Sequence, residues 1–226
     1  MTVDVELWLY GSRARGDSDA LSDTDLLVVG DQGVDIAPAI DELDYPRISP
    51  SFYSWDEVER MAAYGSLFLR HVAAEGERLR ASTTAPRRLP ALLANLPAFS
   101  RSRQDLSGFR RALAESRASL RDGGWPDFEC EVVATVARHA AILGAYCVGE
   151  AAFGRERPFH IAGAALGYAP AEVALLAGPA TAWRLHQPGA HTAQSAINAW
   201  LGLVGRFLDD LEAVIDDYTA LLPQAA

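Results

Sequence analysis

The spacing of apolar residues changes along the chain, and this change limits the folds that the sequence can adopt. In residues 3–10 every second side chain is apolar (Val3, Val5, Leu7 and Leu9), with Asp4 and Glu6 between the first of them, which is the period of a half-buried strand. Beyond about residue 105 apolar positions recur at three- and four-residue intervals, which is typical of helices. Strands that come first, followed by a block of helices, predict an α+β fold.

Short elements separated by turn-forming residues are predicted for the first part of the chain. They are strands at residues 3–10, 23–29 and 47–54 and a helix at residues 36–43. Pro50 restricts the third strand to a sheet edge or a bulge, because proline cannot donate to a strand ladder. Ser54 and Glu57 have the spacing of a capping box, which predicts a helix that begins at Trp55 and ends near Gly76.

A segment rich in Ser, Thr and Pro, between about residues 81 and 97, is the best candidate for a domain boundary. It predicts two domains, residues 1–84 and residues 98–226. Helices of the second domain are predicted at residues 105–121, 127–149, 161–166, 171–176 and 192–222. The apolar positions of the last helix are expected to fill a core, and a homodimer face is the alternative.

The charge balance decides which phosphate-binding functions the chain can have. Its net charge of −10 disfavours bulk binding to nucleic acid, because neutralising a phosphate backbone requires a concentrated basic surface. The sequence contains no lysine, which excludes lysine nucleophiles and Schiff bases. Phosphate chemistry therefore requires a local pocket of arginines.

The sequence predicts a cytoplasmic protein that does not associate with a membrane. Cys130 and Cys147 lie too far apart for a CxxC motif and occur in helix-patterned sequence, so buried, reduced thiols are expected. The N-terminus has no charged-then-apolar leader, and no uninterrupted apolar stretch is long enough to span a bilayer.

Two acidic residues at the start of the second predicted strand can carry the chemistry. Residues two apart in a strand project to the same face, so Asp23 and Asp25 present parallel carboxylates about 7 Å apart along the backbone. Such a pair can bridge divalent ions that clamp a phosphoryl displacement. Magnesium is the natural ion because it is hard and oxygen-seeking. Asp23 and Asp25 are therefore predicted to be the catalytic, metal-binding residues.

A glycine-serine turn after the first strand can bind polyphosphate. Gly11 lets the backbone approach a triphosphate without a Cβ in the way, and the Ser12 hydroxyl and following N–H groups can donate to phosphate oxygens. The guanidinium groups of Arg13 and Arg15 match phosphate oxygens geometrically. These four residues are predicted to bind the nucleotide.

The two motifs together resemble the signature of the DNA polymerase β-type nucleotidyltransferase superfamily, closest to its minimal and aminoglycoside-type branches. They read Gly11-Ser12-Arg13-Ala14-Arg15-Gly16 and Ser22-Asp23-Thr24-Asp25-Leu26-Leu27-Val28. The resemblance implies a small mixed β-sheet nucleotidyltransferase domain followed by an all-α helical bundle domain, either HEPN-like or similar to the C-terminal domain of kanamycin nucleotidyltransferase. It implies Mg²⁺-dependent transfer of a nucleoside monophosphate, expected to be AMP, from an NTP to a hydroxyl acceptor, with release of pyrophosphate. The acceptor is a small molecule such as an aminoglycoside, or a protein, as for antitoxin-like adenylyltransferases.

The sequence departs from the family pattern at the third carboxylate. The family places it on a later strand, where this chain has Ser49 and Ser51. Serine is a weak neutral ligand and cannot act as a base at neutral pH, so a catalytically weakened nucleotide-binding or regulatory module is the alternative function. Candidates for a substitute base are Asp44, Glu129, Glu131 and Glu150, although an ordinary solvated carboxylate is the default interpretation of each.

Two observations concern histidines. Arg155 and His160 have the Arg-x4-His spacing that resembles the RNA-cleaving motif of HEPN domains, but Pro158 interrupts the helix that normally displays it. A ribonuclease is therefore the lesser alternative. His71 shows no metal-ligand spacing, so a packing or surface role is expected for it.

Overall fold

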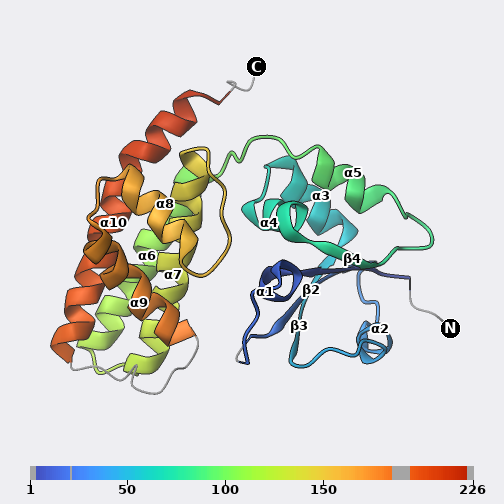
Figure 1. Ribbon diagram of the computed structural model, residues 1–226, viewed down its shortest axis with the longest axis horizontal. Coiled ribbons are helices and arrows are strands. Elements are labelled where there is room, and N and C mark those ends of the chain that lie inside the picture. Colours follow the sequence, from blue (N-terminus) through green and yellow to red (C-terminus); the bar gives the residue numbers. More distant parts are fainter. Residues whose placement is uncertain (1–3, 21, 185–193, 223–226) are drawn as a thin grey trace. The chain divides into compact units, whose positions relative to one another are not determined.

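The computed structural model describes residues 4–20, 22–184 and 194–222, and it confirms the predicted α+β class. The chain divides into two compact units, Met1–Ser100 and Arg101–Ala226. The first unit contains the sheet and the second is helical (Figure 1). Val3 and Thr192, at which two of the predicted elements begin, lie outside the described residues. No helix in the described part combines the length and the apolar character that crossing a bilayer requires.

A four-stranded mixed sheet forms the centre of the first unit, with strand order β3-β2-β1-β4. Its strands are β1 (Glu6–Tyr10), β2 (Thr24–Gly30), β3 (Ile48–Ser54) and β4 (Glu77–Arg80). β1 runs antiparallel to β2 and to β4, whereas β2 and β3 are parallel. β3 lies at the edge of the sheet, as Pro50 predicts.

Helices cover both faces of this sheet (Figure 1). They are α1 (Gly11–Arg15), α2 (Ala37–Asp41), α3 (Trp55–Ala63), α4 (Leu67–Glu75) and α5 (Arg88–Ala94). α3, α4 and α5 pack on the face that contains Tyr10, Leu27 and Val29. The opposite face, which contains Leu26 and Val28, packs against α2 and part of α1. The strand alternation therefore produces two separate apolar clusters.

A helix begins at Trp55 as predicted, but the prediction that it continues to Gly76 is wrong. Ser54 caps α3, because its Oγ accepts from the Glu57 N–H at 3.3 Å while the Glu57 carboxylate accepts from the Ser54 N–H at 2.8 Å. The chain then breaks at Gly65 and continues as α4. Gly65 has φ +70°, and a Cβ there would lie 2.1 Å from the Pro97 carbonyl oxygen. A contact with a distant segment sets this break, so local periodicity does not show it.

Two elements near the expected domain boundary were not predicted from the sequence. β4 adds the fourth strand beside β1, and α5 buries Leu89 and Leu93 in the apolar cluster beneath α3 and α4. A helix as short as α5 is not stable by itself and depends on packing against the rest of its unit. Its prolines and polar flanks therefore resemble a linker in the sequence alone.

The second unit is a helical bundle around one central helix. It contains α6 (Ser102–Arg121), α7 (Pro126–Cys147), α8 (Arg157–Ala165), α9 (Pro170–Arg184) and α10 (Gln194–Ala220). α7 packs against the other four helices. Gly144 allows a close approach, since a Cβ there would lie 2.6 Å from Leu211 on α10 and 3.0 Å from Ala162 on α8. Neither Cys130 nor Cys147 is in a disulfide, and burial raises the pKa of their thiols to about 11 and about 12, so both are inert.

Candidate active site

Gly11 and Asp25 lie against each other where β1 passes into α1. The register of β1 and β2 pairs Tyr10 with Asp25. Gly11 has φ +76°, and a Cβ built on it would lie 2.4 Å from Asp25 Oδ2. The carboxylate thus occupies the space that any other side chain at position 11 would fill, and Gly11 is required both for its backbone angle and for this contact.

Asp23 lies next to the same site, one residue before β2 begins. Thr24 separates it from Asp25 and is buried, with its N–H donating to the Arg47 carbonyl at 2.9 Å and its hydroxyl donating to the Pro46 carbonyl at 2.5 Å. Because successive residues of a strand point to opposite faces, Asp25 points away from the face on which Thr24 is buried, and Asp23 lies just before the strand. Asp23 is exposed and Asp25 is half-buried, so both carboxylates are within reach of solvent.

The two arginines of the turn have partners within the protein. Arg13 donates from Nη2 to the Ser22 carbonyl at 3.1 Å, which ties α1 to the segment immediately before Asp23. Arg15 donates from Nε to Asp17 at 3.1 Å and from Nη1 to Glu75 Oε2 at 2.5 Å. These bonds fix the orientation of both guanidinium groups beside the turn.

Glu75 links Arg15 to a histidine on α4. Its Oε2 lies 2.8 Å from His71 Nε2, and the two side chains are 15% and 12% exposed. Burial raises the pKa of Glu75, but the hydrogen bonds from His71 and Arg15 together outweigh it and the pKa is lowered overall. His71 also packs edge-on against the ring of Tyr10 at 5.3 Å, one residue before Gly11. This network therefore lies next to the Gly11 turn.

The sequence analysis missed Glu75 and expected only a packing or surface role for His71. Their spacing of four residues on one helix predicts that the two side chains are neighbours, and this signal was available. Their contact with Arg15, which is 60 residues from Glu75 in sequence, comes from the tertiary packing of α1 near α4.

Serines occupy the positions on β3 where a third carboxylate is expected. The register pairs Asp25 with Ser49 and Leu27 with Ser51. Ser51 Oγ lies 3.3 Å from the Tyr10 hydroxyl, and Ser49 is exposed. Throughout the described ranges, no group of three or more His, Cys, Asp or Glu side chains is arranged to hold a metal ion. Asp23 and Asp25 remain the predicted metal ligands, and their carboxylate oxygens are of the kind that a hard divalent ion such as magnesium prefers.

The four substitute bases lie in different parts of the molecule. Asp44 is exposed in the loop before β3. Glu129 and Glu131 lie on α7, the first of them buried, and Glu150 follows that helix with its Oε1 3.0 Å from Arg157 Nη2. The last three belong to the second unit, so a role in the site of the first unit stays a prediction for each of them.

The residues considered for RNA cleavage do not share a helix. Arg155 precedes α8, Pro158 lies in its first turn, and His160 is an exposed residue two positions later. The structure therefore gives the ribonuclease alternative no further support.

Comparison with known proteins agrees with this site. The family model described as "Nucleotidyltransferase domain" matches residues 2–67, which is less than a third of the chain. The matched segment includes Gly11, Ser12, Asp23 and Asp25, and it ends at the first residue of α4. No curated protein matches the chain. The family match supports the polymerase β-type nucleotidyltransferase resemblance of this segment and, with it, a general nucleotidyl transfer function.

Proposed function

We propose that the protein is a magnesium-dependent nucleotidyltransferase that transfers AMP from ATP to a hydroxyl acceptor. The observation that supports this most strongly is the position of the Asp25 carboxylate against Gly11. Asp23 lies two residues before Asp25 in the chain, so the proposed phosphate-binding turn and the proposed pair of carboxylates are near each other.

The reaction requires an in-line exchange at the α-phosphorus. The acceptor oxygen forms a bond to this phosphorus while the bond to the oxygen that bridges to the β-phosphate breaks, so pyrophosphate leaves with the bonding electrons. Ser12 and the backbone N–H groups after Gly11 donate to phosphate oxygens, and Arg13 and Arg15 supply positive charge beside them. The acceptor proton passes to a base, for which Asp44, Glu129, Glu131 and Glu150 are the proposed candidates.

Asp23 and Asp25 would hold the magnesium. When bound, the ion supplies positive charge that offsets the charge of the phosphates. The Asp25 carboxylate lies against the turn, because Gly11 leaves the space that it requires.

Pyrophosphate release tests this proposal. The protein is incubated with Mg²⁺ and one of ATP, GTP, CTP or UTP, together with aminoglycoside or protein acceptors, and pyrophosphate is measured with a coupled assay. ATP is expected to give the largest release, and Asp25→Asn is expected to remove it. Asp31→Asn, which removes an exposed carboxylate just beyond β2, is the matched control and should retain release. Release that is equal in both variants would overturn the proposal.

A nucleotide-binding module without turnover is the second candidate. The observation that favours it is Ser49, which pairs with Asp25 in the register where a third carboxylate is expected. This candidate predicts saturable binding of Mg²⁺ and an NTP by calorimetry with no pyrophosphate from any of the four nucleotides. It also predicts that Ser49→Asp creates turnover, because the substitution supplies the missing carboxylate.

The acceptor is proposed to be a small polycation or a protein hydroxyl. An acidic protein attracts polycations, which favours an aminoglycoside. Transfer from α-labelled ATP distinguishes the two, since label on the antibiotic appears in thin-layer chromatography and label on protein remains in the gel.

A further inference from the structure

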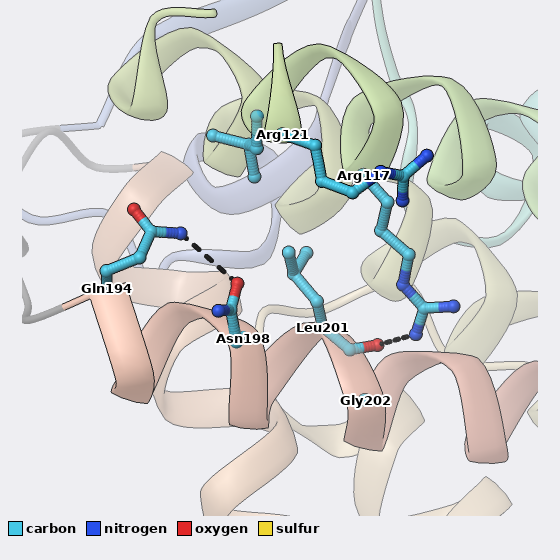
Figure 2. A pocket seen from close by; sticks show the side chains of 7 residues that line it. Arg117, Arg121, Gln194, Asn198, Leu201 and Gly202 are labelled. Carbon is cyan, nitrogen blue, oxygen red and sulfur yellow. Dashed lines mark hydrogen bonds between the residues drawn. The ribbon is translucent and has the colours of Figure 1, made fainter. Parts of the chain in front are cut away.

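A cavity within the second unit lies between the end of α6 and the beginning of α10 (Figure 2). Its volume is about 480 Å³, which is within the range of small-molecule sites. Arg117 and Arg121 reach it from α6, and Gln194, Asn198 and Leu201 line it from α10. The cavity lies in the helical unit and involves none of the residues proposed for nucleotidyl transfer.

The charge of the lining is opposite to the charge of the protein. The chain has a net charge of −10, yet the charged side chains among the described lining residues are the two arginines. Guanidinium groups form paired hydrogen bonds with phosphates and carboxylates. The cavity therefore favours an anion over a neutral or cationic ligand.

Hydrogen bonds within the protein hold the lining donors in place. Arg117 donates from Nη2 to the Leu201 carbonyl at 2.6 Å, which anchors its guanidinium across the gap between the helices. This position depends on Gly205, because a Cβ there would lie 2.6 Å from Arg117 Nη2. The Gln194 amide donates to Asn198 Oδ1 at 3.1 Å. Donors that are already ordered lose less freedom when a ligand binds.

The remaining lining leaves room for an apolar part of the ligand. Leu120 and Leu201 line the cavity, and a Cβ at Gly202 would meet nothing within 4 Å. We propose that this cavity binds a small organic anion whose phosphate or carboxylate group contacts Arg117 and Arg121 and whose compact apolar body lies on the two leucines. Arg121 is exposed, so a ligand that enters from solvent reaches it first. Arg117 is held in place by its bond to the Leu201 carbonyl.

Three matched ligands test this assignment on the full chain. Phenyl phosphate, benzoate and neutral benzyl alcohol share one ring and differ in the group that the arginines would bind. The ¹⁵N side-chain amide signals of Gln194 and Asn198 report on the cavity directly. We expect saturable shifts with phenyl phosphate or benzoate and none with benzyl alcohol. The stronger of the two anions identifies the phosphate or the carboxylate as the preferred group.

Arginine variants show whether the shifts come from this cavity. Loss of one charge-assisted contact is expected to weaken binding about tenfold for Arg121→Gln and for Arg117→Gln. Arg111→Gln makes the same change at an exposed position on α6 outside the cavity, and it should bind as the wild type does. Thermal unfolding of each variant establishes that it is folded.

Three outcomes would overturn the assignment. The first is the absence of saturable shifts with both anions. The second is equal affinity in the wild type and in Arg121→Gln, and the third is equal shifts with benzyl alcohol. Asp25→Asn should leave these titrations unchanged, so this assignment and the proposed transferase activity succeed or fail separately.

Discussion

Two neighbouring parts of the same sheet place acidic side chains in opposite environments. Near the start of β1, Glu6 is 0% exposed and Asp4 is hydrogen-bonded to the segment after β4. Beside the start of β2, Asp23 is exposed, and the Asp25 carboxylate lies against Gly11, which has no side chain. The comparison shows that carboxylates surrounded by the protein's own donors maintain the fold, whereas those beside a glycine turn can serve a ligand.

Donors from three segments surround Glu6. Its Oε1 accepts from the Trp8 indole at 2.8 Å, and its Oε2 accepts from Arg78 Nη2 at 2.9 Å and from the Ser82 N–H at 2.8 Å. These bonds connect β1 to β4 and to the chain beyond it, which would otherwise be held mainly by the strand ladder. A buried carboxylate is tolerated here because its oxygens are occupied.

The largest expected effect is therefore on stability, from Glu6→Ala. The substitution leaves the Arg78 guanidinium, the Ser82 N–H and the Trp8 indole without their acceptor, so we expect the free energy of unfolding to fall by about 3–5 kcal/mol. Urea unfolding followed by circular dichroism measures this. The exposed Glu77 on β4 is the matched control, and Glu77→Ala should stay within about 0.5 kcal/mol of the wild type. A loss below about 1 kcal/mol for Glu6→Ala would contradict a structural role for this carboxylate.

Asp25→Asn is expected to show the opposite behaviour. It keeps the shape of the side chain but removes the charge at the proposed site, so we expect kcat for pyrophosphate release to fall by about 10²–10³-fold, as for other single groups that stabilise a transition state. Urea unfolding should place its stability close to that of the wild type. If the variant loses stability and retains kcat, Asp25 stabilises the fold and does not take part in the reaction.

Local patterns predicted the parts of the fold that depend on neighbours in sequence. The presence of the first strand, the capping box of Ser54 and Glu57, and the edge position implied by Pro50 are all properties of short segments, and the structure confirms them. The half-buried character expected of the first strand is wrong, because apolar clusters cover both faces of the sheet and bury β1 on both sides. The break at Gly65 and the helix α5 depend instead on contacts with segments far along the chain. Periodicity therefore could not predict them.

The same limit applies to the candidate site. Gly11 and Asp25 could be predicted to be neighbours because a turn and a strand of fixed geometry place them together, whereas the roles of these residues and of Asp23 stay predictions. Glu75 could not be predicted as a partner of Arg15, because only the packing of α4 on the sheet brings it there. The arginine cavity between α6 and α10 combines residues about 80 positions apart and has no local signature either.

Glu75→Gln tests a carboxylate that has features of both environments. It is partly buried and ion-paired, as the buried Glu6 is ion-paired, but its partner Arg15 belongs to the turn that we propose binds the nucleotide. Without the charge, Arg15 loses a charge-assisted bond that orients it, so we expect kcat/KM for ATP to fall about tenfold, mainly through KM. Glu77→Gln is the control. An unchanged kcat/KM together with reduced stability would mean that Glu75 stabilises the fold and does not orient Arg15 for the nucleotide.

The smallest expected effect is the pH dependence of the bonds made by Asp4. The hydrogen bond from the Thr84 hydroxyl is the largest of the contributions that lower the Asp4 pKa from 3.8 to about 2, and the Thr83 N–H adds to it at 2.6 Å. Because the pKa is lower in the folded state, this stabilisation is complete above about pH 4 and is lost as the pH falls towards 2. Asp4 is half-buried and its bonds lie at the surface, so solvent screening limits the contribution to below about 1 kcal/mol.

The difference in unfolding free energy between the wild type and Asp4→Asn isolates this contribution from the other groups that titrate in acid. It should be constant from pH 7 to pH 5 and shrink between pH 4 and pH 2. Thr84→Val removes the strongest donor, so the decrease should begin at a higher pH in that variant. A difference that does not change between pH 5 and pH 2 would mean that the carboxylate charge of Asp4 contributes nothing, and that β1 is held at this end by Glu6 and the strand ladder alone.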